Sequence, residues 1–418
     1  MAIDKHTKDG QRANSICSDD VEPQTVLLRD LAYPDRPAIK AGPFGSSIKK
    51  EDYVSTGYKV YGQEQVISGN LLLGDYFLDE KKFNQLKSCA VSPGDVLLSL
   101  VGTIGKALVV PKNAPPGIIN PRLLRISVDK SRINPQYLKH FVEAEPTART
   151  LKRWSQGGTM DVLNGEIVGA LPVYLPCLRM QECVVSTLSE WDTAIEKTEQ
   201  LISARELHYT YELSRLISQG EHPRSHVGNF AKEVSERNRG GNDERVLSVT
   251  NSRGFVLPED QFERRVASAD LSNYKVVARG QYAYNPSRIN VGSIARLDDW
   301  DMGVLSPMYV VFGLDSSRIN SDYFLHWLDS HEARERIKKS AQGSVRETVS
   351  FTEFAAIAFP LPDLDRQAAI ARYLNTLREE ISTLGVYIEK LKEQKRGLMQ
   401  KLLTGQWRVP VASTEVTA

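Results

Sequence analysis

Residues 366–403 read RQAAIARYLNTLREEISTLGVYIEKLKEQKRGLMQKLL. Apolar residues recur in this segment at alternating spacings of four and three, with Lys395 as the one interruption. These apolar positions are Ile370, Leu374, Leu377, Ile381, Leu384, Ile388, Leu391, Leu398 and Leu402. Such an alternation places the apolar side chains on one face of a helix, as in a coiled-coil seam. The segment therefore predicts a long helix that packs along a second helix.

The second helix is predicted over residues 181–217, where the same pattern occurs 186 positions earlier. Its seam positions are Val184, Leu188, Trp191, Ile195, Thr198, Ile202, Arg205, Tyr209, Glu212 and Leu216. A lone heptad helix is usually a dimerisation element or a core helix, but a second copy in phase favours pairing within the chain. We expect Val184, Leu188, Trp191, Ile195 and Ile202 to pair with Ile370, Leu374, Leu377, Ile381, Leu384, Ile388 and Leu391. The polar Arg205 and Glu212 either set the alignment of the two helices or loosen the pairing there.

The repeat continues upstream of the helices at the same spacing. Asp129, Ser131, Arg132, Ile133, Asn134, Tyr137, His140, Gln156, Gly157, Leu175, Pro176, Leu178 and Gln181 match Asp315, Ser317, Arg318, Ile319, Asn320, Tyr323, His326, Gln342, Gly343, Leu361, Pro362, Leu364 and Gln367. A period this long exceeds that of a solenoid repeat. The chain is therefore interpreted as a tandem duplication, each copy being a globular domain followed by a long helix.

The expected fold class is α+β, because strand-like runs punctuated by Gly and Pro alternate with helical spacing in both copies. In the first copy, helical spacing covers residues 133–154 and a strand is expected over residues 167–176. In the second, residues 319–339 are expected to be helical, and residues 281–294 are matched with residues 91–104 at a spacing lengthened by four. The expected segments are a polar tail (1–24), a first domain (25–178), a spacer helix (179–220), a second domain (221–365), a second spacer helix (366–405) and a tail (406–418).

Composition is that of an ordinary globular protein with room for two or three domains. The 53 Lys and Arg against 52 Asp and Glu give a net charge of +1, so the chain lacks the strongly basic footprint of an autonomous DNA binder. The four cysteines form no CxxC pair, which favours free thiols in a reducing cytoplasm. No signal sequence or long apolar run is evident, so we expect a cytoplasmic protein.

No catalytic motif is found in the sequence. Phosphate-binding loops, a GxSxG elbow, HExxH and paired CxxC sites are all missing, so no metal site is expected. Asn285-Pro286 resembles the start of the amino-methyltransferase motif, but Ser287-Arg288 follow in place of the aromatic residue. The acids and lysines of Pro34-Asp35 and Glu80-Lys81-Lys82 loosely imitate a nuclease triad and are better read as solvated surface. The chain is therefore expected to be non-catalytic.

The loops instead offer hydrogen-bonding side chains beside glycine. Arg can pair with guanine and Asn or Gln with adenine, while Lys and backbone amides meet phosphates. Any one of these residues could equally be an ordinary solvated loop residue. The candidates for DNA binding are Ser46, Ser47, Lys49, Lys50, Gln63, Thr103, Lys106, Gln156 and Thr159 in the first copy, and Arg237, Asn251, Arg253, Asn285, Ser287, Arg288, Asn290, Gln342, Ser344 and Arg346 in the second.

Five phrases carry a resemblance to a known family. They are Gly42-Pro-Phe-Gly-Ser-Ser-Ile48, Val246-Leu-Ser-Val-Thr250, Tyr284-Asn-Pro-Ser-Arg288, Leu361-Pro with Gln367, and Lys395-Arg-Gly-Leu-Met-Gln-Lys-Leu-Leu-Thr-Gly405. With the tandem layout, they resemble the specificity subunits of type I restriction–modification systems, over nearly the whole chain. The resemblance implies two target recognition domains, each reading half of a split DNA site, separated by two antiparallel spacer helices.

The resemblance also implies the partners and cofactors. Two methyltransferase subunits would dock on the helices, and ATP-driven restriction subunits would join them on double-stranded DNA. S-adenosylmethionine, ATP and Mg would sit on those partners, with no cofactor in this subunit. A helix of about 37 residues spans roughly 55 Å, enough to hold two reading units one to one and a half turns of DNA apart. The alternative is a duplicated coiled-coil scaffold without DNA specificity. A standalone methyltransferase is disfavoured because the cofactor loop is missing.

Overall fold

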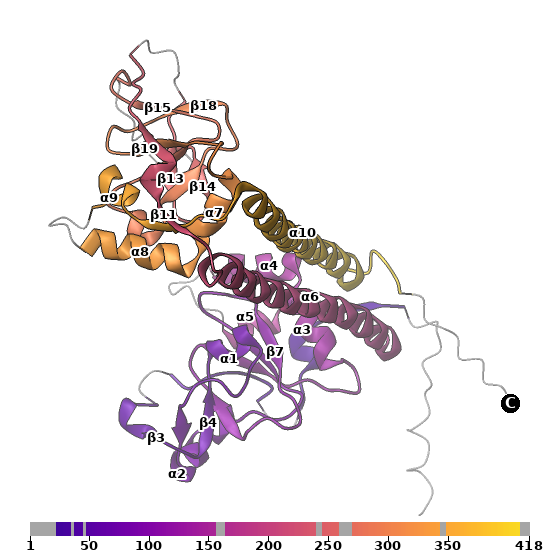
Figure 1. Ribbon diagram of the computed structural model, residues 1–418. Coiled ribbons are helices and arrows are strands. Elements are labelled where there is room, and N and C mark those ends of the chain that lie inside the picture. Colours follow the sequence, from indigo (N-terminus) through magenta and orange to yellow (C-terminus); the bar gives the residue numbers. More distant parts are fainter. Residues whose placement is uncertain are drawn as a thin grey trace, which may run out of the picture. The chain divides into compact units, whose positions relative to one another are not determined.

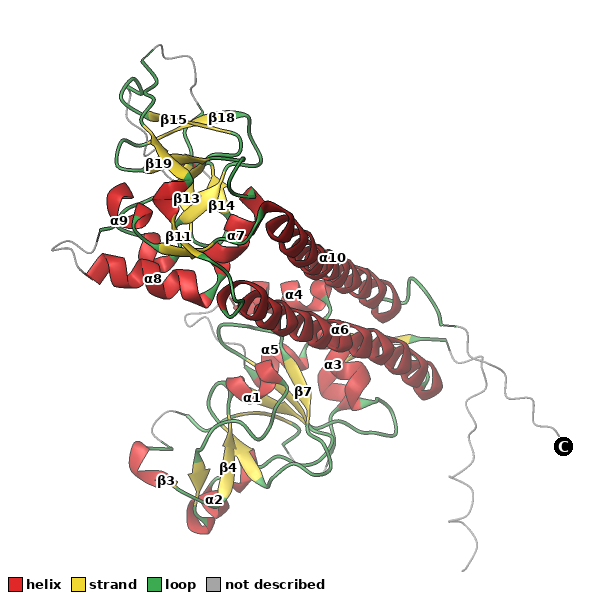
Figure 2. Cartoon of the chain, viewed as in Figure 1, coloured by secondary structure: helices red, strands yellow, loops and turns green. Residues whose placement is uncertain are grey.

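The computed structural model describes residues 22–34, 37–44, 47–155, 164–239, 245–258, 270–342 and 348–409, with only the backbone of Gln342. The chain divides into two compact units. The first unit comprises residues 1–197 and 388–418, and the second unit comprises residues 198–387. Each unit contains both helices and strands (Figures 1 and 2), so the expectation of a mixed fold is confirmed.

Among its described residues, the first unit has two four-stranded sheets and a two-stranded one. Their orders are β2-β9-β6-β7, β3-β5-β4-β8 and β1-β10. The strands are β1 (Gln24–Leu27), β2 (Ile39–Ala41), β3 (Tyr53–Val54), β4 (Tyr58–Tyr61), β5 (Phe77–Leu78), β6 (Val96–Ser99), β7 (Ala107–Val109), β8 (Gly117–Ile119), β9 (Leu123–Ile126) and β10 (Pro172–Leu175). The helices are α1 (Gln63–Ser68), α2 (Glu80–Gln85), α3 (Pro135–Glu143), α4 (Glu145–Ser155) and α5 (Gly165–Gly169), with parts of the long helices α6 (Leu178–Leu213) and α10 (Leu364–Leu403).

The described part of the second unit has one four-stranded sheet, β12-β19-β16-β17, and three strand pairs, β11-β20, β13-β14 and β15-β18. Its strands are β11 (Arg224–His226), β12 (Ala231–Val234), β13 (Ser248–Thr250), β14 (Gly254–Val256), β15 (Lys275–Ala278), β16 (Tyr282–Tyr284), β17 (Ile294–Arg296), β18 (Met302–Leu305), β19 (Val310–Leu314) and β20 (Ala358–Pro360). Its helices are α7 (Ser321–Asp329), α8 (His331–Gln342) and α9 (Phe351–Ala355), with the remaining parts of α6 and α10.

Corresponding strands of the two units pair in the same register. Val96 of β6 faces Ile126 of β9, and Tyr282 of β16 faces Phe312 of β19, at equivalent positions of the repeat. The expected match of residues 281–294 with residues 91–104, lengthened by four, is therefore wrong. That alignment relied on the glycine-rich bends. The strand Val96–Ser99 itself contains no glycine, and its equivalent in the second unit is the aromatic strand Tyr282–Tyr284.

A buried glutamine at the start of each long helix makes the same hydrogen bonds in both units. The backbone N–H of Asn134 donates to Gln181 Oε1 at 2.8 Å, and that of Asn320 donates to Gln367 Oε1 at 2.7 Å. The amide nitrogen of Gln181 donates to the Pro176 carbonyl, as that of Gln367 does to Pro362. Because buried polar groups need partners, this glutamine ties its helix to the globular part of its unit.

The two long helices run antiparallel within each unit. In the first unit Lys395 Nζ forms an ion pair with Asp192, and Val184 and Leu188 share a core cluster with Leu402. As residue numbers rise along α10 they fall along α6. Burying these side chains stabilises the pairing by roughly 1.5–3 kcal/mol per large aliphatic residue.

The same direction holds in the second unit. Arg205 Nη2 lies 3.0 Å from Glu380 Oε1, and Leu213 clusters with Leu374. Glu212 instead pairs with Arg215, in the π-helical turn that follows α6. Of the expected pairing residues, Val184, Leu188, Ile370, Leu374, Leu377, Ile388 and Leu391 are buried, and Trp191, Ile195, Ile202, Ile381 and Leu384 are half-buried.

Three sequence expectations about local structure are wrong. The helix expected over residues 133–154 is two helices, because Ala144 is extended and Pro146 cannot continue an α-helical hydrogen-bond pattern. The helix expected over residues 319–339 breaks at Ser330, whose hydroxyl accepts the Ala333 N–H as a new N-cap. The strand expected over residues 167–176 begins as helix α5, capped by Asn164, and becomes a strand only at Pro172.

Candidate nucleic-acid interface

Six of the predicted DNA-binding residues cannot be placed as side chains. Ser46, Gln156, Thr159, Ser344 and Arg346 lie outside the described residues, and for Gln342 only its backbone position at the end of α8 is described. The interface is therefore built from the remaining candidates, unit by unit.

In the first unit, Lys49 precedes a short 3-10 turn, Lys50–Asp52, and both lysines are exposed. The N–H of Lys49 donates to Asp52 Oδ2 at 2.6 Å, and Lys82 Nζ lies 3.0 Å from the same oxygen. These contacts lower the pKa of Asp52, the hydrogen bond from the Lys49 backbone first and Lys82 second. The nearby carboxylates of Glu51 and Asp52 offset part of the positive charge. Ser47 precedes this turn and is half-buried.

The side chain of Gln63 points into the first unit. Its amide nitrogen donates to Ser99 Oγ at 2.6 Å and to the Val101 carbonyl. Gln63 thus holds the bend between β6 and β7, on which Thr103 and Lys106 are exposed. In this arrangement Gln63 positions the bend, and Thr103 and Lys106 are the groups that can meet a ligand.

In the second unit, four predicted residues are brought together around one concave site of about 510 Å³. Asn251, Asn285, Ser287 and Arg288 line it, although Asn251 follows β13 and Asn285 follows β16. The other lining residues are Val246, Leu247, Ser248, Val249, Thr250, Pro258, Tyr274, Val291, Ser293, Ser306, Met308 and Tyr309. The predicted Arg237, Arg253 and Asn290 lie elsewhere among the described residues. The volume falls in the range of ligand-binding pockets.

One wall of this site is the turn that follows β16. Asn285 Oδ1 accepts the Ser287 N–H at 3.0 Å, and the Asn285 carbonyl accepts the Arg288 N–H at 2.9 Å. Side-chain and backbone bonds of this kind fix a tight turn. Pro286 suits the turn because it has no backbone N–H that would need a partner. The turn leaves the side chains of Ser287 and Arg288 exposed at the rim.

Another wall is formed by β13 and the loop before β19. Ser248 Oγ lies 3.1 Å from the Tyr309 hydroxyl, and Ser293 Oγ donates to the Val249 carbonyl at 2.8 Å. Sequence reasoning missed Tyr309, which is buried. No local signal distinguishes it, because the pairing of β19 with β16 brings it to the site. Its neighbour Met308 is exposed beside it.

The exposed side chains of this site can bind a ligand through hydrogen bonds. Exposed Arg288, Ser287 and Asn251 supply hydrogen-bond donors and acceptors of the kinds that read base edges. Among the residues that the structure describes, no group of three or more His, Cys, Asp or Glu is placed to hold a metal ion. The described helices also include none that is long and apolar enough to cross a membrane.

No protein-family model matches the chain, whereas individual proteins resemble it. A relative from Methanocaldococcus jannaschii, described as a putative type I restriction enzyme MjaX specificity subunit, is 22% identical over 367 residues, covering 80% of this chain and 83% of the relative. The chain resembles type I specificity subunits. The resemblance stated from the sequence motifs is thereby confirmed.

Solved structures of type I restriction–modification proteins resemble this chain in fold. A chain from a structure of complex assembly and conformational transition in a type I restriction–modification system has a TM-score of 0.60 and 14% identity, covering 92% of this chain and 98% of that one. The type I S subunit from M. genitalium has a TM-score of 0.53 and 13% identity, covering 93% and 97%. These two likenesses show that the chain shares its fold with those structures.

Proposed function

We propose that this chain is the DNA-recognition subunit of a type I restriction–modification complex. Each globular part reads one half of a bipartite DNA site, and the paired helices set the gap between the halves. Two methyltransferase subunits dock on the helices, and restriction subunits join for cleavage. S-adenosylmethionine, ATP and Mg act on those partners, in the cytoplasm.

The proposal rests on one observation: the two units repeat the same scaffold of helices and strands but differ in their loops. The glutamine bonds of Gln181 and Gln367 and the strand registers recur at equivalent positions of the repeat. In contrast, the loop between β6 and β7 carries Thr103 and Lys106, while the corresponding turn of the second unit carries Asn285, Ser287 and Arg288. A repeated scaffold with divergent reading loops suits two half-sites of different sequence, because specificity comes from side chains on rigid turns.

Methylation mapping of the two half-sites tests the proposal. Residues 26–175 are exchanged for the corresponding domain of a relative, and the DNA of cells that carry the matching methyltransferase is sequenced for methylated adenine. One half-site should change and the other should stay the same. If both halves changed, or if methylation did not depend on this chain, the proposal would be wrong.

The near-neutral charge supports a division of labour within the complex. DNA affinity from phosphate contacts grows with the number of counterions released, and a net charge of +1 offers few such contacts. The isolated chain should therefore bind DNA weakly, and specific binding should require methyltransferase subunits that enclose the duplex.

A further inference from the structure

One buried histidine in the second unit bonds to both long helices. His326 lies on α7 and is fully buried. Its Nδ1 is 2.9 Å from the hydroxyl of Tyr209 on α6, and its Nε2 is 2.8 Å from Oδ1 of Asn375 on α10. A single imidazole therefore joins the globular part of the unit to each member of the helix pair.

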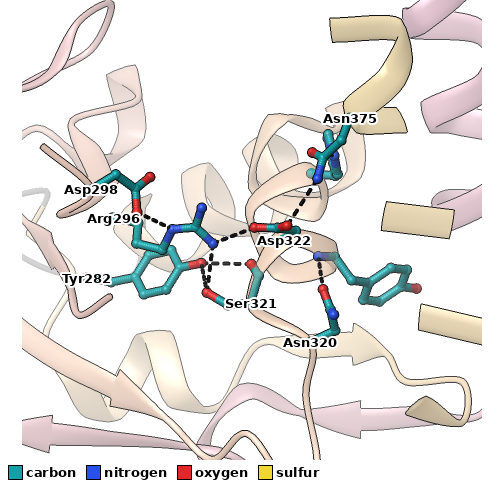
Figure 3. A network of polar contacts seen from close by, with 9 residues as sticks. Tyr282, Arg296, Asp298, Asn320, Ser321, Asp322 and Asn375 are labelled. Carbon is teal, nitrogen blue, oxygen red and sulfur yellow. Dashed lines mark hydrogen bonds and ion pairs between the residues drawn. The ribbon is translucent and has the colours of Figure 1, made fainter. Parts of the chain in front are cut away.

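The surrounding bonds determine which ring nitrogen carries the proton. The amide nitrogen of Asn375 donates to Asp322 Oδ2 at 3.0 Å (Figure 3), so its oxygen is left to accept from Nε2 of His326. Arg378 donates to the Tyr209 hydroxyl oxygen at 2.9 Å, so the hydroxyl proton is free to be donated to Nδ1. These donors and acceptors are all matched when the imidazole is neutral with its proton on Nε2.

Electrostatics support this neutral form. Burial lowers the pKa of His326, and the Arg378 guanidinium lowers it further, against opposing contributions from Asn375, Asp329 and Asp322. Burial also raises the pKa of Tyr209 to about 12, so its hydroxyl keeps the proton that it donates.

The network continues into the sheet of the second unit. Asp322 Oδ1 accepts from Arg296 Nη1 at 2.6 Å, and Arg296 Nε pairs with Asp298 at 2.7 Å (Figure 3). The hydroxyl of Tyr282 donates to the Ser321 carbonyl at 2.8 Å. A continuous chain of polar contacts thus runs from β17 through α7 to α10. The network is buried at His326 and exposed at Asp298, so an arrangement that leaves a member unpaired is penalised most at its buried end.

The first unit is joined to the helices differently. His140, the counterpart of His326 in the repeat, is also buried, but its Nδ1 has no hydrogen-bond partner among the described residues. Ser189 and Asp192 are the counterparts of Asn375 and Arg378, and Asp192 pairs with Lys395 of α10. The two units therefore share the histidine position but not the bonds around it, which makes His140 a matched control.

We propose that His326, Tyr209 and Asn375 are positioning residues that fix the angle at which the globular part of the second unit leaves the helix pair. They thereby restrict the DNA gap length that the complex accepts. This inference rests on the proposed function, because a gap length has meaning only for a bipartite DNA site. Because the histidine is buried, both of its ring nitrogens keep hydrogen-bond partners only in this arrangement of α7 with α6 and α10.

The test measures gap discrimination in the complex with methyltransferase subunits. The substrates keep both half-sites and vary the gap by one or two base pairs, and the readout is methylation at the preferred gap relative to its neighbours. His326→Phe removes both bonds and keeps an aromatic ring, and Tyr209→Phe removes one hydroxyl. Each variant loses two hydrogen bonds. Each should therefore lower this methylation ratio at least about fivefold, since one lost bond is worth roughly a factor of two to ten. His326→Gln keeps an N–H donor for Asn375 and should recover part of the ratio, and His140→Phe should leave it unchanged.

Folding is followed in parallel by thermal unfolding of every variant. If His326→Phe does not fold, Tyr209→Phe decides, because it changes one buried atom. A folded Tyr209→Phe complex with undiminished gap discrimination would overturn the inference, as would a loss of methylation that is equal at all gaps. If the wild-type complex methylates no bipartite site, the proposed function itself fails, which is a different result from unchanged discrimination.

Discussion

Lengthening both helices by one heptad should lengthen the gap in the DNA site. The ion pairs Asp192–Lys395 and Arg205–Glu380 bracket the place where the insertion belongs. Duplicating residues 191–197 and residues 381–387 adds one heptad to each helix there and keeps the 4-3 seam. A heptad adds about 10.5 Å at roughly 1.5 Å per residue, which is close to three base pairs at about 3.4 Å per base pair. The seam also returns to within about 20° of its original direction.

The assay is adenine-methylation sequencing of a plasmid library in which the gap between the half-sites has every length from the native value to six base pairs more. Cells carry the methyltransferase subunits with either the native or the lengthened chain. The preferred gap should move by about three base pairs while both half-sites stay the same. A control with the insertion in α6 alone leaves the helices unequal, so it should lose activity without a new preference. An unchanged gap with full methylation would refute the idea that the helices act as a ruler.

Four further outcomes are expected. Arg288→Ala should weaken methylation by about fivefold or more at sites specified by the second unit, because one base-pairing arginine is worth about 1–3 kcal/mol. A substrate panel with one base changed at a time would show no altered position if Arg288 is only a solvated loop residue. Burial, aided by Lys139 and Lys395 against Asp192, lowers the pKa of His140 to about 4, so the unfolded chain takes up a proton below about pH 6.5 that the folded chain rejects. Unfolding free energy should then fall by up to about 3 kcal/mol from about pH 6.5 to about pH 4, and calorimetry across this range should show a flatter profile for His140→Phe. Lys395→Leu should leave the melting temperature equal or higher, because it completes the apolar seam and leaves Asp192, which is about half exposed, free to hydrate; a large drop would mean that the ion pair is strongly stabilising. In gel shifts at about 0.15 M salt the isolated chain should bind DNA no better than about micromolar, and tight specific binding would contradict this expectation.

The helices were the most predictable part of the fold because heptad spacing is a local property of the sequence. The buried seam residues Leu374, Leu377 and Ile388 fall where the pattern puts them. Helix breaks were less predictable. Ala144 and Ser330 interrupt segments whose spacing stays helical, and the interruption is visible only through Pro146 and through the capping hydroxyl of Ser330.

The candidate site was predictable only in part. The turn Asn285–Arg288 stood out because its residue types are typical of reading loops, and it does line the concave site. Gln63 has the same residue type, yet its amide is used inside the unit by Ser99 and the Val101 carbonyl. Tyr309 reaches the site because β19 pairs with β16, a strand that is distant from it in sequence. Residue type therefore predicts which groups can bind, and tertiary contacts decide which of them are available.

The polar residues in the heptad seam have a physical role that the pattern alone does not reveal. Tyr209 and Lys395 occupy equivalent seam positions of the two helices. In the second unit Tyr209 accepts from Arg378, and in the first unit Lys395 pairs with Asp192, the counterpart of Arg378 in the repeat. Tyr209 and Lys395 thus each meet a polar partner on the opposite helix, and Tyr209 also contacts the buried His326 of α7. A purely apolar seam would pair the helices equally well in several registers, whereas these partners match in one. The interruption at Tyr209 therefore lies where α6 meets His326 of the globular part, whereas the interruption at Lys395 lies where α10 pairs with α6.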